Sequence, residues 1–144
     1  MSSCLDRRAA CAGLALALAL SLVLACATGA ARAPVEEYRL SGAAAGSWRA
    51  VRDGFHREAF VPCLARRGVT VSCGGCTAVV LRGVLRIDAR GRFAGFERTF
   101  GRFCGAEMPP DVERCLIDYF RSTEFPVELR NLAIAVDLGR GLKC

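Results

Sequence analysis

Apolar residues after residue 46 recur at helical spacing. They follow Ser47, a residue suited to cap a helix, at steps of three and four: Trp48, Val51, Phe55 and Ala59. Pro62 stands inside this pattern. Because proline interrupts the helical hydrogen-bond ladder, we expect a kink or a second short helix that runs to Arg67. Residues 68–75 then predict a loop.

The next stretch alternates with the two-residue period of a strand. It runs from Thr77 to Asp88 and is rich in branched residues. Its two faces are Leu81, Leu85 and Ile87 on one side, and Arg82, Val84 and Arg86 on the other. Residues 89–91 predict a turn in which Gly91 tolerates a positive φ, and Phe93–Phe100 returns as the partner strand. The pattern therefore predicts a β-hairpin.

A second helix and a last strand follow the hairpin. Pro109 and Pro110 suit the first turn of a helix. The apolar face of this helix is expected to be Val112, Cys115, Leu116, Tyr119 and Phe120. Phe125 and Pro126 end the segment, and residues 132–138 alternate well enough to predict the last strand.

The predicted order is helix, strand, strand, helix, strand. A right-handed crossover through the second helix makes strand three parallel to strand two. In an antiparallel sheet, strand three then lies beside strand one, in the order 2-1-3, with both helices on one face. The sequence therefore predicts an α+β fold with two layers, helices over a three-stranded antiparallel sheet.

The first residues have the composition of an export signal. Arg7 and Arg8 precede an uncharged run, residues 9–31, and Val23–Cys26 resembles the site at which a lipoprotein cysteine is lipidated. We expect a signal peptide over residues 1–26, lipidation at Cys26, a flexible tether over 27–46 and one domain over 47–144. Two alternatives stay open: ordinary signal-peptidase cleavage near Cys26, and an uncleaved segment that remains in the membrane.

Export changes the interpretation of charge. The chain has a formal net charge of +6, carried mostly by arginine. The simplest interpretation is dispersed, solvated charge. If the charge serves binding, an exported protein is expected to contact anionic lipid, lipopolysaccharide or a cell-wall polymer rather than nucleic acid. The expected location is the periplasm or the outer membrane, with a lipid anchor. A tether of twenty residues reaches no further than about 70 Å.

Export also changes the interpretation of the cysteines. The chain has nine, of which Cys4, Cys11 and Cys26 lie in the signal. Six remain in the domain: Cys63, Cys73, Cys76, Cys104, Cys115 and Cys144. An even number in an oxidising compartment predicts three disulfides.

The ordered motifs resemble a known family. They are residues 60–63, 81–87, 91–93, 112–116 and 125–126: a helix cysteine, a glycine-containing strand, a glycine turn, a second helix cysteine and a Phe-Pro pair. Together they resemble the TonB C-terminal-like domain, in the form found in gliding-motility proteins and small lipoproteins. The resemblance covers about residues 55–138. It implies a binding module without catalysis that engages partners by adding its edge strand to theirs. The short tether, with Pro34 as its one proline, does not suit the force transmission of TonB itself.

The predicted topology and the family both bear on cysteine pairing. Cys63 and Cys115 are expected at similar heights on neighbouring helices, matching the cysteine pair of the family. Because the hairpin turns near residue 90, residues whose numbers sum to about 180 should face each other. This rule pairs Cys76 with Cys104 and leaves Cys73 for Cys144. The pairs Cys73–Cys104 and Cys76–Cys144 remain an alternative.

The Cys73-Gly-Gly-Cys76 motif has a redox interpretation as well. A thioredoxin-like cysteine needs the N-terminus of a helix to lower its pKa, whereas this motif precedes a strand. Zinc ligation by four cysteines is chemically feasible but disfavoured in an oxidising compartment. A thiol–disulfide oxidoreductase that uses Cys73 and Cys76 is therefore the alternative function, and structural disulfides are the main prediction.

Little else in the sequence suggests catalysis. The only histidine, His56, is expected at a surface or helix edge, and no catalytic, cofactor or metal site is predicted. Arg82 and Arg86 share one strand face, and the sum rule places Arg98 opposite Arg82. The main prediction for these three arginines is a solvated face, and the alternative is that they contact an anionic partner. The leading expectation is a non-catalytic lipoprotein of the cell envelope that acts as a protein- or envelope-interaction module.

Overall fold

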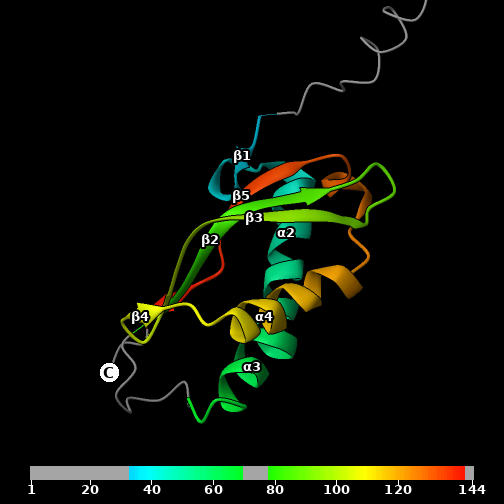
Figure 1. Ribbon diagram of the computed structural model, residues 1–144. Coiled ribbons are helices and arrows are strands. Elements are labelled where there is room, and N and C mark those ends of the chain that lie inside the picture. Colours follow the sequence, from blue (N-terminus) through cyan, green and yellow to red (C-terminus); the bar gives the residue numbers. More distant parts are fainter. Residues whose placement is uncertain (1–32, 70–77, 142–144) are drawn as a thin grey trace, which may run out of the picture. The chain divides into compact units, whose positions relative to one another are not determined.

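The helices of the fold lie on one side of a sheet. A computed structural model of the chain describes residues 33–69 and 78–141 (Figure 1). The helical elements are η1 (Glu37–Arg39), α2 (Gly42–Phe55), η2 (His56–Phe60), α3 (Val61–Ala65), α4 (Pro110–Ser122) and η3 (Val127–Leu129). The strands are β1 (Val35–Glu36), β2 (Ala78–Ile87), β3 (Phe93–Phe103), β4 (Ala106–Glu107), β5 (Ala133–Asp137) and β6 (Arg140–Gly141).

The three long strands, β3, β2 and β5, lie in the predicted order. β2 is central and pairs antiparallel with both neighbours. The prediction of a purely antiparallel three-stranded sheet is wrong, because three two-residue strands extend it. β1 adds to β5 in parallel, β4 adds to β3, and β6 adds to β2, which makes the sheet mixed. The α+β class is confirmed.

The predicted tether is also wrong over residues 33–46. β1 pairs with Ile134 and Ala135 of β5, and α2 begins at Gly42 rather than at Ser47. Residues 43–45 are alanines, the strongest helix formers, so the helix extends back through them to Ser41. Ser47 lies within α2, where its hydroxyl donates to Glu128 at 3.1 Å.

One carboxylate fixes the N-terminal segment to the fold. Glu37 Oε2 accepts hydrogen bonds from Trp48 Nε1 at 2.9 Å and Arg52 Nη1 at 2.8 Å. Glu37 Oε1 accepts the backbone N–H of Asp137 at 3.2 Å. This carboxylate, 14% exposed, thus joins η1 to α2 and to the end of β5.

The predicted interruption at Pro62 is confirmed and takes the form of a π-helical turn. Pro62 has no N–H to donate, and the turn His56–Phe60 precedes the short helix α3. The N–H of Val61 bonds the carbonyl of His56, five residues earlier. The helix therefore continues past the proline by widening one turn rather than by ending.

The core lies between the helices and the sheet face that they cover. Its largest fully buried side chains include Phe60, Phe120, Phe125, Leu64, Leu81 and Leu85. Phe55 of α2 and Phe120 of α4 stack with ring centroids 5.1 Å apart.

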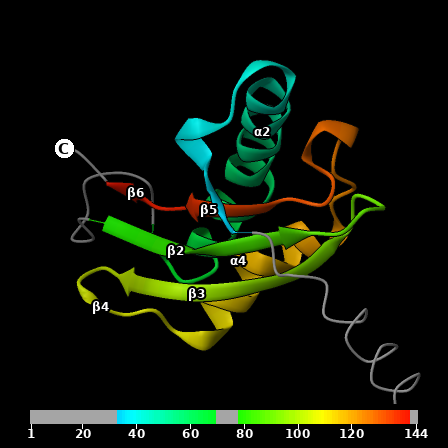
Figure 2. The ribbon, with the colours of Figure 1, turned by 90° about the horizontal axis from the view of Figure 1, so that it is seen from above.

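The Cys63–Cys115 disulfide joins α3 to α4, as predicted, with an S–S distance of 2.04 Å. In Figure 2, which views the molecule from above, α4 lies across β2 and β3.

Two β-bulges change the hairpin register. The turn itself forms as predicted, with Gly91 at φ 79°. Register shifts fall between Arg86 and Ile87 and between Arg82 and Gly83, so Arg82 faces Phe100 and Gly83 faces Arg98. The prediction that Arg98 lies opposite Arg82 is therefore wrong. An extra residue in β3 reverses the side on which the following side chains point.

Candidate functional site: the open edge of β3

β3 is the outermost long strand of the sheet. On the side away from β2, the described residues pair with it only at Arg102 and Phe103, through β4. On this side, away from β2, no described strand lies beside the stretch Phe93–Phe100, as Figure 2 shows. Proteins seldom leave a strand edge of this length uncovered, because its unpaired backbone groups can bond to another chain.

The register shows which backbone groups face the open side. Leu81 accepts the N–H of Leu138, and Ile87 donates to the carbonyl of Leu132, so both residues bond toward β5. By the alternation of a strand, Gly83 and Leu85 also bond toward β5. Opposite these residues on β3 stand Phe93, Phe96 and Arg98. These three residues therefore turn their N–H and C=O groups toward the open edge.

A groove of about 390 Å³ runs beside this edge, between β3 and α4. Its apolar residues are Phe93, Phe96, Pro110 and Ile117. Phe93 and Phe96 are three residues apart, a spacing that would place them on opposite faces of a regular strand. The bulge after Phe93 places both on the helix side, so the groove has an apolar floor.

The groove is bordered by charged side chains of α4. Glu113, Arg114 and Arg121 line it. The Arg121 guanidinium lies 5.9 Å from the centroid of the Phe93 ring and pairs with Asp118 at 3.0 Å. Arg98 crosses from β3 to pair with Glu113 at 3.0 Å. An extended chain beside β3 would thus meet backbone donors and acceptors, an apolar floor and a polar rim.

The three arginines predicted to contact an anionic partner do not form one surface. Arg82 pairs with Asp137 at 2.8 Å and Arg86 with Glu97 at 3.5 Å on the sheet face away from the helices. Arg98 lies on the helix side, paired with Glu113. Each positive charge has an acidic neighbour, so this geometry gives no convergent anion site.

The remaining predicted cysteine pairs fall largely outside the described residues. Cys104 is disulfide-bonded, and its partner lies outside them. Cys73, Cys76 and Cys144 are also outside, so the two alternative pairings stay predictions. The same holds for lipidation at Cys26 and for redox chemistry of the Cys73–Cys76 motif.

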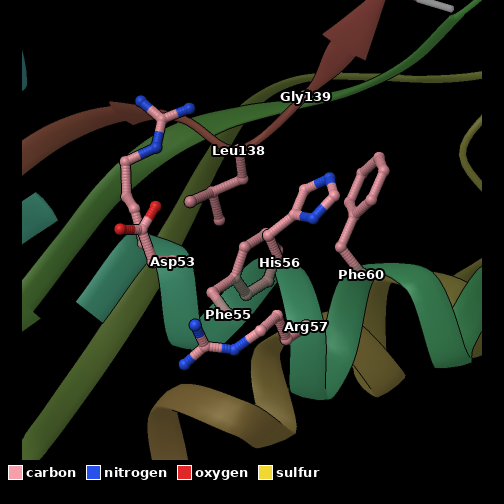
Figure 3. A pocket seen from close by; sticks show the side chains of 8 residues that line it. Asp53, Phe55, His56, Arg57, Phe60, Leu138 and Gly139 are labelled. Atoms are coloured by element: carbon pink, nitrogen blue, oxygen red, sulfur yellow. The ribbon is translucent and has the colours of Figure 1, made fainter. Parts of the chain in front are cut away.

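His56 lines a cavity of about 360 Å³ between α2, η2 and the segment after β5 (Figure 3). Its imidazole stacks on Phe60 with centroids 5.3 Å apart. Both side chains point from the π-helical turn toward Leu138 and Gly139, while Arg57 points away from them. Arg52, at the same cavity, is already bonded to Glu37 and to the carbonyl of Asp137. The cavity therefore brings together a stacked histidine and an arginine whose guanidinium is already hydrogen-bonded. None of the residues that line it is an evident nucleophile.

Over residues 33–69 and 78–141, no three His, Cys, Asp or Glu side chains are placed to hold a metal ion. No helix in those ranges is long and apolar enough to cross a membrane. Comparison with known proteins adds no assignment: no family model, curated protein or solved structure matches this chain.

Sequence reasoning missed the groove and its rim. The available signal was the pair Phe93 and Phe96, whose odd spacing in a strand indicates a bulge. In the sequence alone, the charged rim cannot be told apart from an ordinary solvated helix face. It consists of Glu113, Arg114 and Arg121. Its position beside β3 follows only from the packing of α4.

Proposed function

We propose that this protein is a non-catalytic interaction module of the cell envelope that captures an extended segment of a partner protein along β3. The observation that carries the proposal is the open edge over Phe93–Phe100. An extended peptide that adds to such an edge gains main-chain hydrogen bonds, and its alternate side chains enter any adjoining pocket.

The groove between β3 and α4 supplies that pocket. Side chains of an added strand point alternately to the two faces of the sheet. Those directed to the helix side would meet Phe93, Phe96 and Ile117, and those near the rim would meet Arg114 or Arg121. The preferred partner segment therefore carries apolar residues at every second position.

The proposal includes a relationship to the TonB C-terminal-like domain. It is supported by the order of the three long strands and by the Cys63–Cys115 disulfide between the helices. It also includes an export signal, a lipid on Cys26 and a location in the periplasm or outer membrane, which rest on the sequence. The proposed partner is an envelope protein rather than a nucleic acid.

The test uses a proline on the open edge. Arg98 turns its N–H toward the open edge, so Arg98→Pro removes an outward donor while leaving the bonds between β3 and β2 in place. Arg98→Ala is the matched control, since it loses the same ion pairs but keeps the N–H. Peptides selected from a library on the wild-type protein are then titrated against both variants, with circular dichroism to check folding.

We expect peptide affinity to fall at least about tenfold in Arg98→Pro, the order of one lost hydrogen bond, and to change little in Arg98→Ala. Slowed amide exchange of Phe96 on peptide binding would place the peptide at β3. Equal affinity of folded Arg98→Pro and Arg98→Ala would contradict strand addition. Insulin reduction by the wild type that Cys76→Ser abolishes would favour the oxidoreductase instead.

A further inference from the structure

The connection between the proposed lipid anchor and the folded domain is shorter than the predicted tether of residues 27–46. Only residues 27–32 separate Cys26 from Ala33, where the described fold begins. Fully extended, the chain from Cys26 to Ala33 spans about 25 Å at most. If the lipid is on Cys26, the corner of the domain that carries Ala33 must stay close to the membrane.

The fold resists lengthening this connection. Residues 35–39 cannot leave the domain unless β1 separates from β5 and Glu37 gives up Trp48, Arg52 and the N–H of Asp137. A carboxylate with three donors is costly to release. The corner near β1 is thus held beside the membrane by the protein's own packing.

The side chains at this corner suit a lipid surface. Tyr38 is 75% exposed, more than any other large apolar or aromatic residue that the structure describes. It lines one hollow with Pro34 and another with Leu40 and Arg49. An exposed tyrosine is favourable in the headgroup region of a membrane, where its ring is buried and its hydroxyl stays hydrated.

Two arginines flank this tyrosine. The Arg39 guanidinium lies 5.9 Å from the centroid of the Tyr38 ring, and Arg49 is exposed in the middle of α2. Neither forms an ion pair with a described residue, unlike Arg82 and Arg86 on the sheet face. Two exposed acidic residues lie near them: Glu36, and Asp53, which lines the same hollow as Tyr38 and Arg49. Each arginine near an anionic leaflet contributes about 1 kcal/mol, so the contact is weak without the anchor.

We infer that Tyr38, Arg39 and Arg49 form a membrane-contact corner that rests on the anionic lipid surface holding the Cys26 lipid. The inference rests on the proposed anchoring and is independent of strand capture. β1 and β3 lie on opposite sides of the central strands, so contact at this corner leaves the β3 edge open. The anchor raises the local concentration of lipid enough for a weak contact to persist.

The test is fluorescence quenching of the full, lipidated chain in vesicles. The vesicles contain phosphatidylethanolamine and phosphatidylglycerol brominated on their acyl chains. Tyr38→Trp reports on the corner, and Val61→Trp is the matched control. Val61 is 38% exposed on α3, which Figure 1 shows far from β1. The wild type supplies the background of Trp48, which is buried.

We expect quenching of Tyr38→Trp to exceed that of Val61→Trp several-fold, and to fall with salt and when Arg39 and Arg49 are both changed to glutamate. Equal quenching of the two reporters would overturn the inference. Absence of palmitate label from the wild type, with Cys26→Ser as control, would overturn it as well. Peptide binding by the same preparations would then still decide the proposed function separately.

Discussion

The hydroxyl of Tyr119 on α4 lies in the space where Gly54 of α2 would carry a β-carbon. The same hydroxyl donates a hydrogen bond to the carbonyl of Val51 at 3.1 Å. Burial raises the pKa of Tyr119 above its usual value of 10.0, so the phenol stays protonated as the donor. The two helices thus approach closely because one of them has a glycine at the contact.

This contact predicts opposite effects for two glycines of one helix. Gly54→Ala should destabilise the protein by about 1–3 kcal/mol, because the new methyl group displaces the Tyr119 hydroxyl. Gly46→Ala is the control: nothing lies within 4 Å of its added β-carbon, so it should stabilise by about 0.5–1 kcal/mol. Urea unfolding measures both.

A double-mutant cycle tests the cause. Combining Gly54→Ala with Tyr119→Phe should recover much of the loss, since the phenylalanine lacks the displaced oxygen. Additive losses in the double variant would mean that another contact limits Gly54.

The Cys63–Cys115 disulfide should be a major source of stability. It closes a loop with a sequence separation of 52 residues. Replacing both cysteines by alanine should cost about 2–4 kcal/mol, because the unfolded chain regains freedom. Thermal unfolding under non-reducing conditions measures the loss. Peptide mapping that finds free thiols at both positions in the native protein would refute the pairing.

Asp88 should make the hairpin turn sensitive to acid. Its Oδ1 accepts the N–H groups of Arg92 and Arg90, each at 2.8 Å. The bond from Arg92 is the main cause that lowers the pKa of Asp88 below its usual 3.8. Because the folded-state pKa is the lower one, the stability from this carboxylate is present above pH of about 4 and is lost as pH falls through the folded-state value.

The comparison that isolates this effect is Asp88→Asn, which keeps an acceptor oxygen but does not titrate. Unfolding free energies are measured from neutral pH to about pH 3, where carboxylates of ordinary pKa protonate. The wild type should lose more stability over this range than Asp88→Asn. Identical pH profiles would show that the turn does not depend on the charged form.

Adjacent glutamates should differ sharply in their contribution. Glu37→Ala removes the acceptor shared by Trp48, Arg52 and Asp137 and should cost about 1–3 kcal/mol. Glu36→Ala, its exposed neighbour, should change stability by less than about 0.5 kcal/mol. Hydrogen exchange should also show faster exchange of Val35 in Glu37→Ala alone. Equal stability of the two variants would mean that β1 is held by other contacts.

The periodic elements were predictable from local patterns. The alternation that placed Leu81, Leu85 and Ile87 on one face of β2 is confirmed, because one face of the strand is buried and the other is not. The face of α4 that buries Val112, Leu116 and Phe120 follows the helical period equally well. Burial on a single side is the physical basis of both successes.

The failures have a different cause. The shift that separates Arg98 from Arg82 depends on Thr99, whose side chain does not mark it as a bulge residue. β1 is two residues long and pairs with a strand about a hundred positions away, so no local pattern reveals it. The helical propensity of residues 43–45 was a usable signal for the early start of α2. An open edge is likewise a property of which strands meet, and it belongs to the tertiary structure alone.

The pairing of β1 with β5 also constrains the order of folding. A ribosome releases Val35 and Glu37 long before Ile134 and Asp137, and the bond from Asp137 to Glu37 spans 100 positions. β1 must therefore wait, unpaired, until β5 has been synthesised and has left the tunnel. Loop closure over such a distance is slow compared with helix and hairpin formation. The pairing of β1 with β5 is thus expected to form later than the β2–β3 hairpin.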